Sequence, residues 1–132
     1  MSIAVGVVMD PISRINPKKD TTLAMLLGVQ RRGWDIHYME LNDLGLRDGI
    51  PFAQMRALKV EDSLTHWYEF TGEKEHRPLA DLDVVLMRKD PPFDTEYIFA
   101  TYLLEQAQAR GSLVVNDPRA LRDANEKLFT AW

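Results

Sequence analysis

In the stretch MRKDPPFD, from Met87 to Asp94, four charged residues and two prolines follow directly on the apolar run Leu82–Met87. Charges beside a hydrophobic core are costly unless they are paired or solvated. Arg88 is the sharpest candidate for a ligand contact, because a guanidinium offers a planar fork of donors suited to a carboxylate and stays charged when partly buried. The alternative is that Arg88 pairs with Asp90 or Asp10 and only fastens loops, and the sequence leaves both open. Lys89 is expected to point the opposite way from Arg88, toward solvent or an interface.

Two further polar loops follow apolar runs, and they are Asp10–Asn16 and Asn116–Pro118. In open parallel sheets ligands bind beyond the carboxyl ends of the strands, so these loops and the one at Arg88 are expected to form a crevice. Ser13 and Asn16 could donate hydrogen bonds to a polar ligand there. Lys18 precedes a predicted helix N-terminus, where anions are favoured. For each of these three residues the alternative is a merely solvated side chain.

Searches for established catalytic motifs find none. The chain has neither GxGxxG nor GxxxxGK[ST], which excludes a dinucleotide fingerprint and a P-loop. His37, His66 and His76 have no metal-ligand spacing, and there are no cysteines, so a zinc site is not expected. A phospho-receiver domain would need an acidic pair after the first strand, where Asp10 stands alone. The residues alone therefore predict a ligand-binding crevice and no catalytic residues.

Composition sets the class of protein. With 132 residues, 45% hydrophobic and 27% charged, the chain fits a single soluble domain with a real core. The net charge of −4 argues against nucleic acid or an anionic membrane as the main partner. No run approaches the ~20 apolar residues that span a bilayer, and the N-terminus does not resemble a signal peptide. The expected location is the cytoplasm.

The elements that must position these residues begin with a βαβ unit. Ile3–Met9 is a continuous apolar run typical of a strand buried on both faces. Asp20 is a natural N-cap for a helix over Thr21–Arg32, and Gly33 is expected to end it in a left-handed turn. Asp35–Leu41 follows as the second strand, and such units close into parallel sheets.

Residues 42–80 predict an antiparallel excursion. Apolar alternation flanks the pair Asp48-Gly49, which is the strongest hairpin signal in the chain. Trp67, Tyr68 and Phe70 predict a further short strand that ends at Gly72. The segment 72–78 is expected to be a solvated turn.

The βα rhythm returns in the last third of the chain. It predicts a strand, a long helix from Asp94 or Thr95 to about Arg110 stopped by Gly111, another strand, and a helix capped by Asp117; the two strands are Asp83–Met87 and Leu113–Val115. Apolar side chains from Tyr97 onward cover more than one face of the long helix. It therefore lies either between two layers or against a partner subunit. The apolar end, residues 127–132, is expected to continue into a longer protein, the alternative being a terminal helix docked on the core.

Four stretches resemble the N-terminal part of bacterial glutathione synthetase, and the match is weakest between Arg47 and Pro78. They are VVMDPISRINPKKDTTLAMLLGVQRRGW, HYMELNDL, LADLDVVLMRKDPPFDTEYIFATYLLE and VVNDPRALRDANEKLFTAW. The resemblance implies an α/β, Rossmann-like pre-ATP-grasp domain, with a mostly parallel sheet flanked by helices and an antiparallel hairpin insertion around residues 44–72. It places this domain at residues 1–124 and the start of the ATP-grasp region at 125–132.

The resemblance also implies a reaction. ATP phosphorylates the C-terminal carboxylate of γ-glutamylcysteine, the amine of glycine attacks the acyl phosphate, and glutathione, ADP and phosphate leave, with Mg²⁺ bridging the phosphates. Arg88 then matches a carboxylate clamp for the peptide substrate, with Ser13, Asn16 and Lys18 as weaker loop contacts. Lys127 resembles the lysine that reaches the nucleotide phosphates.

Two function classes remain open for the chain. One is the substrate-side domain of the ligase, inert without the ATP-grasp domain, which carries most nucleotide and metal ligands. The other is a non-catalytic α/β ligand-binding or oligomerisation module. The resemblance implies a homo-oligomer, a dimer or a tetramer, with the aromatic-rich helix from Tyr97 as a candidate contact.

Overall fold

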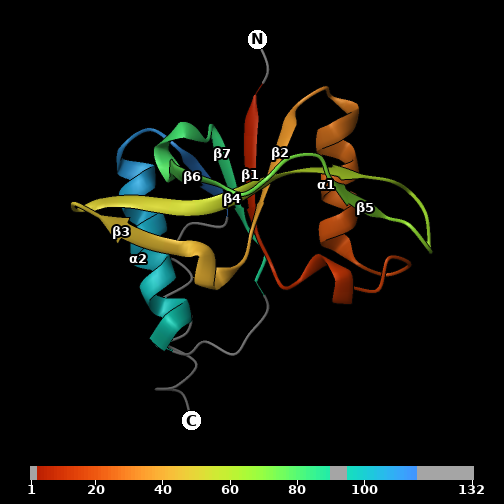
Figure 1. Cartoon of the computed structure of the whole chain (residues 1–132), viewed down its shortest axis with the longest axis horizontal. Coiled ribbons are helices and arrows are strands. Elements are labelled where there is room, and N and C mark those ends of the chain that lie inside the picture. Colours follow the sequence, from red (N-terminus) through yellow and green to blue (C-terminus); the bar gives the residue numbers. More distant parts are fainter. Residues whose placement is uncertain (1–2, 90–94, 116–132) are drawn as a thin grey trace.

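The computed structural model describes residues 3–89 and 95–115, in which a curled sheet carries a helix on each face (Figure 1). Helix α1, Thr21–Arg31, links β1 to β2, and helix α2, Thr95–Ala109, links β7 to β8. The parallel part of the sheet runs in the order β2-β1-β7-β8, with strands Asp35–Met39, Ala4–Val8, Val84–Met87 and Leu113–Val115. The predicted βα rhythm is confirmed.

Alternation along β1 explains the two layers of helix. Successive strand residues point to opposite faces, so Val7 packs in the same cluster as Leu26 of α1, whereas Val8 packs with Leu104 of α2. All four side chains are 0% exposed. The continuous apolar run of this strand therefore marks burial on both faces, as predicted.

Local chemistry sets the helix ends. The carboxylate of Asp20 accepts a hydrogen bond of 2.9 Å from the N–H of Leu23, which satisfies one of the free donors at the start of α1. Gly33 has φ of 78° and Gly111 has φ of 114°, the region that favours glycine. The predicted cap and both predicted stops are confirmed.

The predicted hairpin is also present. Strand β3, Leu44–Arg47, turns into β4, Ile50–Val60, through Asp48 and Gly49, whose φ angles are 53° and 76°. Two successive positive φ values are the signature of the turn that matches the twist of paired strands. Strand β5, Tyr68–Phe70, pairs with the far end of β4. The antiparallel insertion around residues 44–72 is therefore confirmed.

Only the first part of segment 72–78 is the exposed turn that its polar composition predicted, and the second part is a strand. Residues Glu75–Pro78 form strand β6, which pairs antiparallel with the first half of β4. The reason is the length of β4, whose 11 residues leave an edge that β5 does not cover. Polar and charged residues are the usual composition of such an edge strand.

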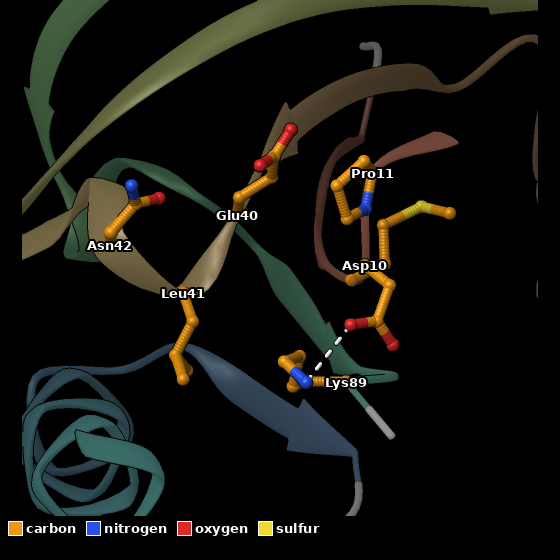
Figure 2. A pocket seen from close by; sticks show the side chains of 7 residues that line it. Asp10, Pro11, Glu40, Leu41, Asn42 and Lys89 are labelled. Carbon is orange, nitrogen blue, oxygen red and sulfur yellow. Dashed lines mark ion pairs between the residues drawn. The ribbon is translucent and has the colours of Figure 1, made fainter. Parts of the chain in front are cut away.

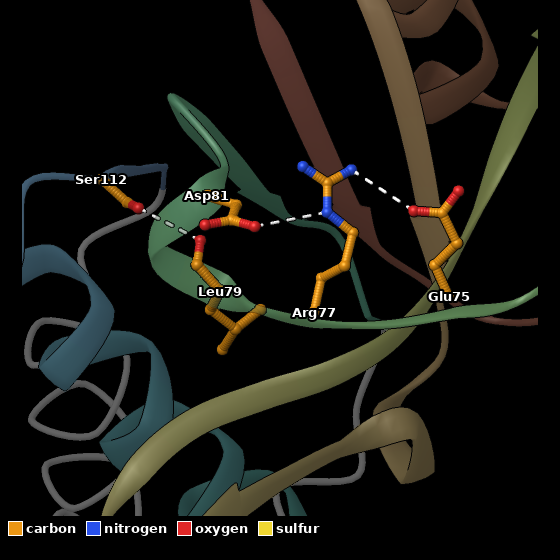
Figure 3. A network of polar contacts seen from close by, with 5 residues as sticks. All are labelled: Glu75, Arg77, Leu79, Asp81 and Ser112. Atoms are coloured by element: carbon orange, nitrogen blue, oxygen red, sulfur yellow. Dashed lines mark hydrogen bonds and ion pairs between the residues drawn. The ribbon is translucent and has the colours of Figure 1, made fainter.

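Polar contacts tie β6 to the parallel part of the sheet (Figure 3). Arg77 pairs with Glu75 at 3.7 Å and with Asp81 at 3.3 Å, and Asp81 closes the short 3₁₀ turn η3, Leu79–Asp81. The hydroxyl of Ser112, 3% exposed, lies 3.3 Å from the carbonyl oxygen of Leu79. These contacts join β6, η3 and the start of β8.

Helix α2 is apolar on more than one face, as predicted. Tyr97 is 3% exposed and packs in the core, whereas Phe99 and Tyr102 are each 50% exposed. None of the described helices is long and apolar enough to cross a membrane. The expected helix at Asp117, and the boundary between residues 1–124 and 125–132, lie outside the described residues.

Candidate functional site

The carboxyl ends of β1, β2 and β7 open into two cavities that share Met9 and Asp10 in their walls. The β2-side cavity, about 280 Å³, is drawn in Figure 2 and is lined by Met9, Asp10, Pro11, Glu40, Leu41, Asn42 and Lys89. The α1-side cavity, about 180 Å³, is lined by Met9, Asp10, Ile15, Lys19, Asp20, Thr21, Thr22 and Arg88. This is the edge of the sheet where the sequence predicted a crevice.

Arg88 points from the end of β7 to the start of α1. Its backbone N–H donates to the carbonyl of Val8 at 2.8 Å, which extends the pairing of β1 and β7 by one step. Its guanidinium donates from Nε to the hydroxyl of Thr22 at 3.2 Å and from Nη2 to that of Thr21 at 2.8 Å. The side chain is thus held against helix α1, and Asp90 lies outside the described residues.

Lys89 lies in the other cavity, so the predicted divergence of the two cations is confirmed, but its side chain faces Asp10 and not solvent. Its Nζ is 2.9 Å from a carboxylate oxygen of Asp10 (Figure 2). The lysine side chain is only 19% exposed and the aspartate 35%. Asp10 is therefore paired with Lys89, and it lies in the walls of both cavities.

The α1-side cavity combines a guanidinium and a helix N-terminus, which attract anions, with the carboxylates of Asp10 and Asp20. The first N–H groups of a helix have no intrahelical acceptor, and α1 presents them beside the guanidinium of Arg88 and near Lys19. Asp20 already takes the N–H of Leu23, which leaves other first-turn donors for a ligand. A carboxylate of a small molecule would meet both the fork of Arg88 and the helix end.

The three predicted loop contacts do not line either cavity in the described part of the chain. Ser13, Asn16 and Lys18 are all exposed. The side-chain oxygen of Asn16 accepts a hydrogen bond of 3.1 Å from the N–H of Lys18, which makes it part of the turn before α1. Lys127 lies outside the described residues.

Glu40 is a crevice residue that sequence reasoning missed. It caps the 3₁₀ turn η2, Leu41–Asp43, where its N–H donates to Asp43 at 2.8 Å and its carboxylate accepts from the Asp43 backbone. The hydroxyl of Tyr38 donates to Glu40 at 2.5 Å. Burial, and then this hydrogen bond, raise the pKa of Tyr38, so its hydroxyl keeps its proton. Glu40 and Asp43 have the spacing of a capping box but not its usual residue types, so the sequence carried no clear signal for this turn.

The described residues do not provide a magnesium site. Among them no group of three or more His, Asp or Glu side chains could hold a metal ion. The residues that do converge, Arg88 and Lys19 beside a helix N-terminus, suit an organic anion instead.

Comparisons with known proteins show the family of this chain. The model for "Prokaryotic glutathione synthetase, N-terminal domain" matches residues 3–122. Glutathione synthetase of Escherichia coli O127:H6 is 62% identical over 130 residues, covering 98% of this chain and 41% of that protein. The glutathione synthetases of Vibrio vulnificus CMCP6 and Yersinia pestis are each 61% identical over 130 residues, with 41% and 40% of their lengths covered. The chain thus spans about two fifths of the length of these relatives, and it belongs to the family of prokaryotic glutathione synthetase N-terminal domains.

Proposed function

We propose that this chain is the substrate-side domain of an ATP-dependent ligase that joins γ-glutamylcysteine to glycine and releases glutathione, ADP and phosphate. Membership of the family supports the reaction. The observation that carries the role of this domain is Arg88, held at the rim of a cavity beside the N-terminus of α1. In this proposal the described residues bind and orient the peptide, and the phosphoryl chemistry takes place on residues beyond them.

Arg88 acts on the carboxylate that does not react. γ-Glutamylcysteine has two carboxylates, and the one on cysteine must attack the γ-phosphorus of ATP. A guanidinium paired with that nucleophile would withdraw its charge, whereas a guanidinium on the glutamyl carboxylate fixes the peptide without opposing the attack. After phosphorylation the amine of glycine attacks the acyl carbon and phosphate leaves. Arg88 holds the far end of the peptide throughout.

The remaining site residues have secondary roles in the proposal. Ser13, Asn16 and Lys18 belong to the exposed loop that carries Ile15 and Lys19 into the α1-side cavity, and they contact parts of the peptide that project from it. Lys127 binds the nucleotide phosphates. Mg²⁺ neutralises those phosphates when bound, and its ligands are expected outside the described residues.

Assembly is a second candidate role, favoured by one observation. Phe99 and Tyr102 are each half exposed on α2, which is a large apolar area for a helix surface. We propose that this face contributes to a homo-oligomer of the full-length ligase. Sedimentation of a Phe99→Ser, Tyr102→Ser variant tests this role, which an unchanged oligomeric state would contradict.

The experiment for the ligase role measures ADP and glutathione formation by a full-length protein that carries this sequence as its N-terminal part. The full-length protein is expected to turn over γ-glutamylcysteine, glycine and MgATP, and the 132-residue chain alone is expected to be inactive. Arg88→Ala should raise KM for γ-glutamylcysteine about tenfold to a hundredfold, the cost of a charged hydrogen-bonded pair, with KM for ATP unchanged. The KM of Arg88→Lys for γ-glutamylcysteine should lie between those of the unmodified protein and of Arg88→Ala.

Arg47→Ala is the matched control, because Arg47 is an exposed arginine at the end of β3, outside both cavities. It should leave all constants unchanged. If Arg88→Ala also leaves KM and kcat unchanged, Arg88 only fastens β7 to α1. Turnover by the isolated chain would contradict the division of labour between the domains.

A further inference from the structure

Both backbone polar groups of Ile12 are bound by side chains from distant parts of the chain. Ile12 is 1% exposed and begins the short 3₁₀ turn η1, Ile12–Arg14, directly after Asp10 and Pro11. Its N–H donates to the hydroxyl of Tyr38 at 3.1 Å, and its carbonyl accepts from the indole N–H of Trp67 at 2.9 Å. Buried backbone polar groups need such partners, and here neither hydrogen bond is part of a helix or of strand pairing.

Tyr38 and Trp67 pack in the same hydrophobic cluster but come from different parts of the chain. Tyr38 lies in β2, beside β1, and is 7% exposed. Trp67 precedes β5 in the antiparallel insertion, where its carbonyl accepts from the N–H of Glu61 at 2.9 Å and closes the connection from β4. The insertion and the parallel sheet therefore meet at the peptide groups of one residue.

Tyr38 extends this contact to the crevice. Its hydroxyl accepts from Ile12 and donates to Glu40, so the N–H, the hydroxyl and the carboxylate form one chain of hydrogen bonds. Each bond in such a chain polarises the next. Glu40 lines the β2-side cavity together with Pro11 (Figure 2). The loop after β1 and the loop after β2 are thus fixed relative to one another at the cavity wall.

We propose that Tyr38 and Trp67 are positioning residues for peptide-substrate binding, which they serve by fixing the loop Asp10–Asn16 without touching the substrate. This inference rests on the proposed ligase function. Asp10 lies in the walls of both cavities, and Ile15 lies in the wall of the α1-side cavity. Loss of either hydrogen bond to Ile12 lets this loop sample other conformations, and the crevice must then pay the ordering entropy when the substrate binds.

Tyr38→Phe and Trp67→Phe in the full-length protein test the proposal, and each keeps an aromatic ring. Trp67→Phe deletes the donor to the carbonyl of Ile12, whereas Tyr38→Phe deletes both the acceptor of the Ile12 N–H and the donor to Glu40. Trp67→Phe should raise KM for γ-glutamylcysteine about threefold to tenfold, the worth of one hydrogen bond, and Tyr38→Phe should raise it at least as much, with kcat and KM for ATP unchanged. Tyr38→Phe should also speed hydrogen exchange of the Ile12 amide by a similar factor in the 132-residue chain, while the amides of β1 keep their protection.

Tyr68→Phe is the matched control. Tyr68 lies next to Trp67, and its hydroxyl makes no hydrogen bond within the part of the chain that the structure describes. This variant should leave KM and the Ile12 amide unchanged.

Three results would overturn the proposal. They are an unchanged KM for γ-glutamylcysteine in both variants, a rise in KM for ATP to the same extent, or an Ile12 amide that exchanges no faster in Tyr38→Phe. Failure of the ligase proposal is distinguishable, because the unmodified full-length protein would then make no glutathione while the exchange measurement still reports on the loop.

Discussion

At the scale of single residues, Arg88 occupies a position that a bound anion would stabilise. A cation at a helix N-terminus opposes the helix dipole, an effect of about 0.3–1 kcal/mol, and among the described residues the hydroxyls of Thr21 and Thr22 and the carboxylates of Asp10 and Asp20 offset part of it. An anion placed between the guanidinium and the helix N-terminus is attracted by both, which offsets the repulsion between them. The geometry therefore favours occupation by a carboxylate, which is the physical reason to expect a large effect of Arg88→Ala on KM.

Ser112 carries a prediction on stability. Ser112 is 3% exposed, and its hydroxyl donates to the carbonyl of Leu82 at 2.7 Å and lies 3.3 Å from the carbonyl of Leu79, the contact drawn in Figure 3. Ser112→Ala leaves the carbonyl of Leu82 short of a donor in a buried site, whereas the carbonyl of Leu79 keeps the N–H of Leu82 at 3.0 Å. The free energy of unfolding should fall by about 1–3 kcal/mol in urea, with an unchanged m-value. Ser13→Ala, at an exposed serine, is the control, and an equal loss there would contradict the role of Ser112.

The residues predicted correctly from sequence are those whose chemistry is local. Asp20 caps a helix that begins at the next residue, and Gly33 and Gly111 supply positive φ just after a helix. Tyr38 and Trp67 were missed because their partner, Ile12, is 26 and 55 residues away. No spacing rule connects an aromatic side chain to a backbone group at that distance in the sequence. The role of Arg88 in substrate binding stays a prediction, which the KM of Arg88→Ala tests.

At the scale of elements, β4 determines how the insertion joins the sheet. One of its edges pairs with β3 and then β2, and the other pairs with β6 and then β5. The hairpin was predictable because its turn chemistry lies in adjacent residues. Strand β6 was not, because the sequence EHRP has the polarity of a loop and becomes a strand only through its partner. The signal in the sequence was the long alternation of β4, which needs partners on both sides.

The side chain of Gln30 joins α1 to β4 by two hydrogen bonds, and these give the second prediction on stability. Its amide donates to the carbonyl of Val60 at 2.7 Å and accepts from the N–H of Val60 at 2.8 Å. Val60 is 1% exposed, so Gln30→Ala strands both groups, and the free energy of unfolding should fall by about 2–3 kcal/mol. Gln30→Glu keeps the acceptor and should lose less. Gln106→Ala, at an exposed site on α2, should lose almost nothing, and a comparable loss there would contradict the role of Gln30.

At the scale of the whole molecule, net charge does not describe the crevice. The chain carries −4 overall, yet the side chains of the α1-side cavity balance, with Arg88 and Lys19 against Asp10 and Asp20, beside a helix N-terminus. Composition alone predicted the absence of a nucleic-acid partner and could not locate an anion site. The α/β class was predictable because buried parallel strands and capped helices leave local signals, whereas the order of the strands depends on pairings between distant segments. The net charge of the chain therefore does not locate this crevice, whereas the topology places it at the carboxyl ends of the parallel strands.

The pH dependence of the folded state tests how the two parts of the sheet pack, because His37 lies between them. Its position in β2 pairs with Gly6 of β1 and Ala57 of β4. Burial lowers the pKa of His37 from its ordinary 6.5, and the nearby charge of Arg77 lowers it further, against the opposing effects of Asp35 and Glu75. The unfolded chain therefore binds a proton at His37 more readily than the native protein does. The stability that the folded protein gains from a neutral His37 is therefore fully present above pH 6.5, the ordinary pKa. It is lost as the pH falls through the lowered pKa of the folded protein.

Urea unfolding of the chain and of His37→Gln between pH 8 and pH 5 measures this contribution as a difference between two curves. That difference should be constant above about pH 7 and should shift against the unmodified chain as the pH drops. Carboxylates that titrate in the same range cancel, because both proteins carry them. His66→Gln, at an exposed histidine, should keep the pH profile because His37 is still present. A difference that stays flat down to pH 5 would mean that His37 is as well hydrated in the native protein as in the unfolded chain, and that β2 and β4 do not bury it.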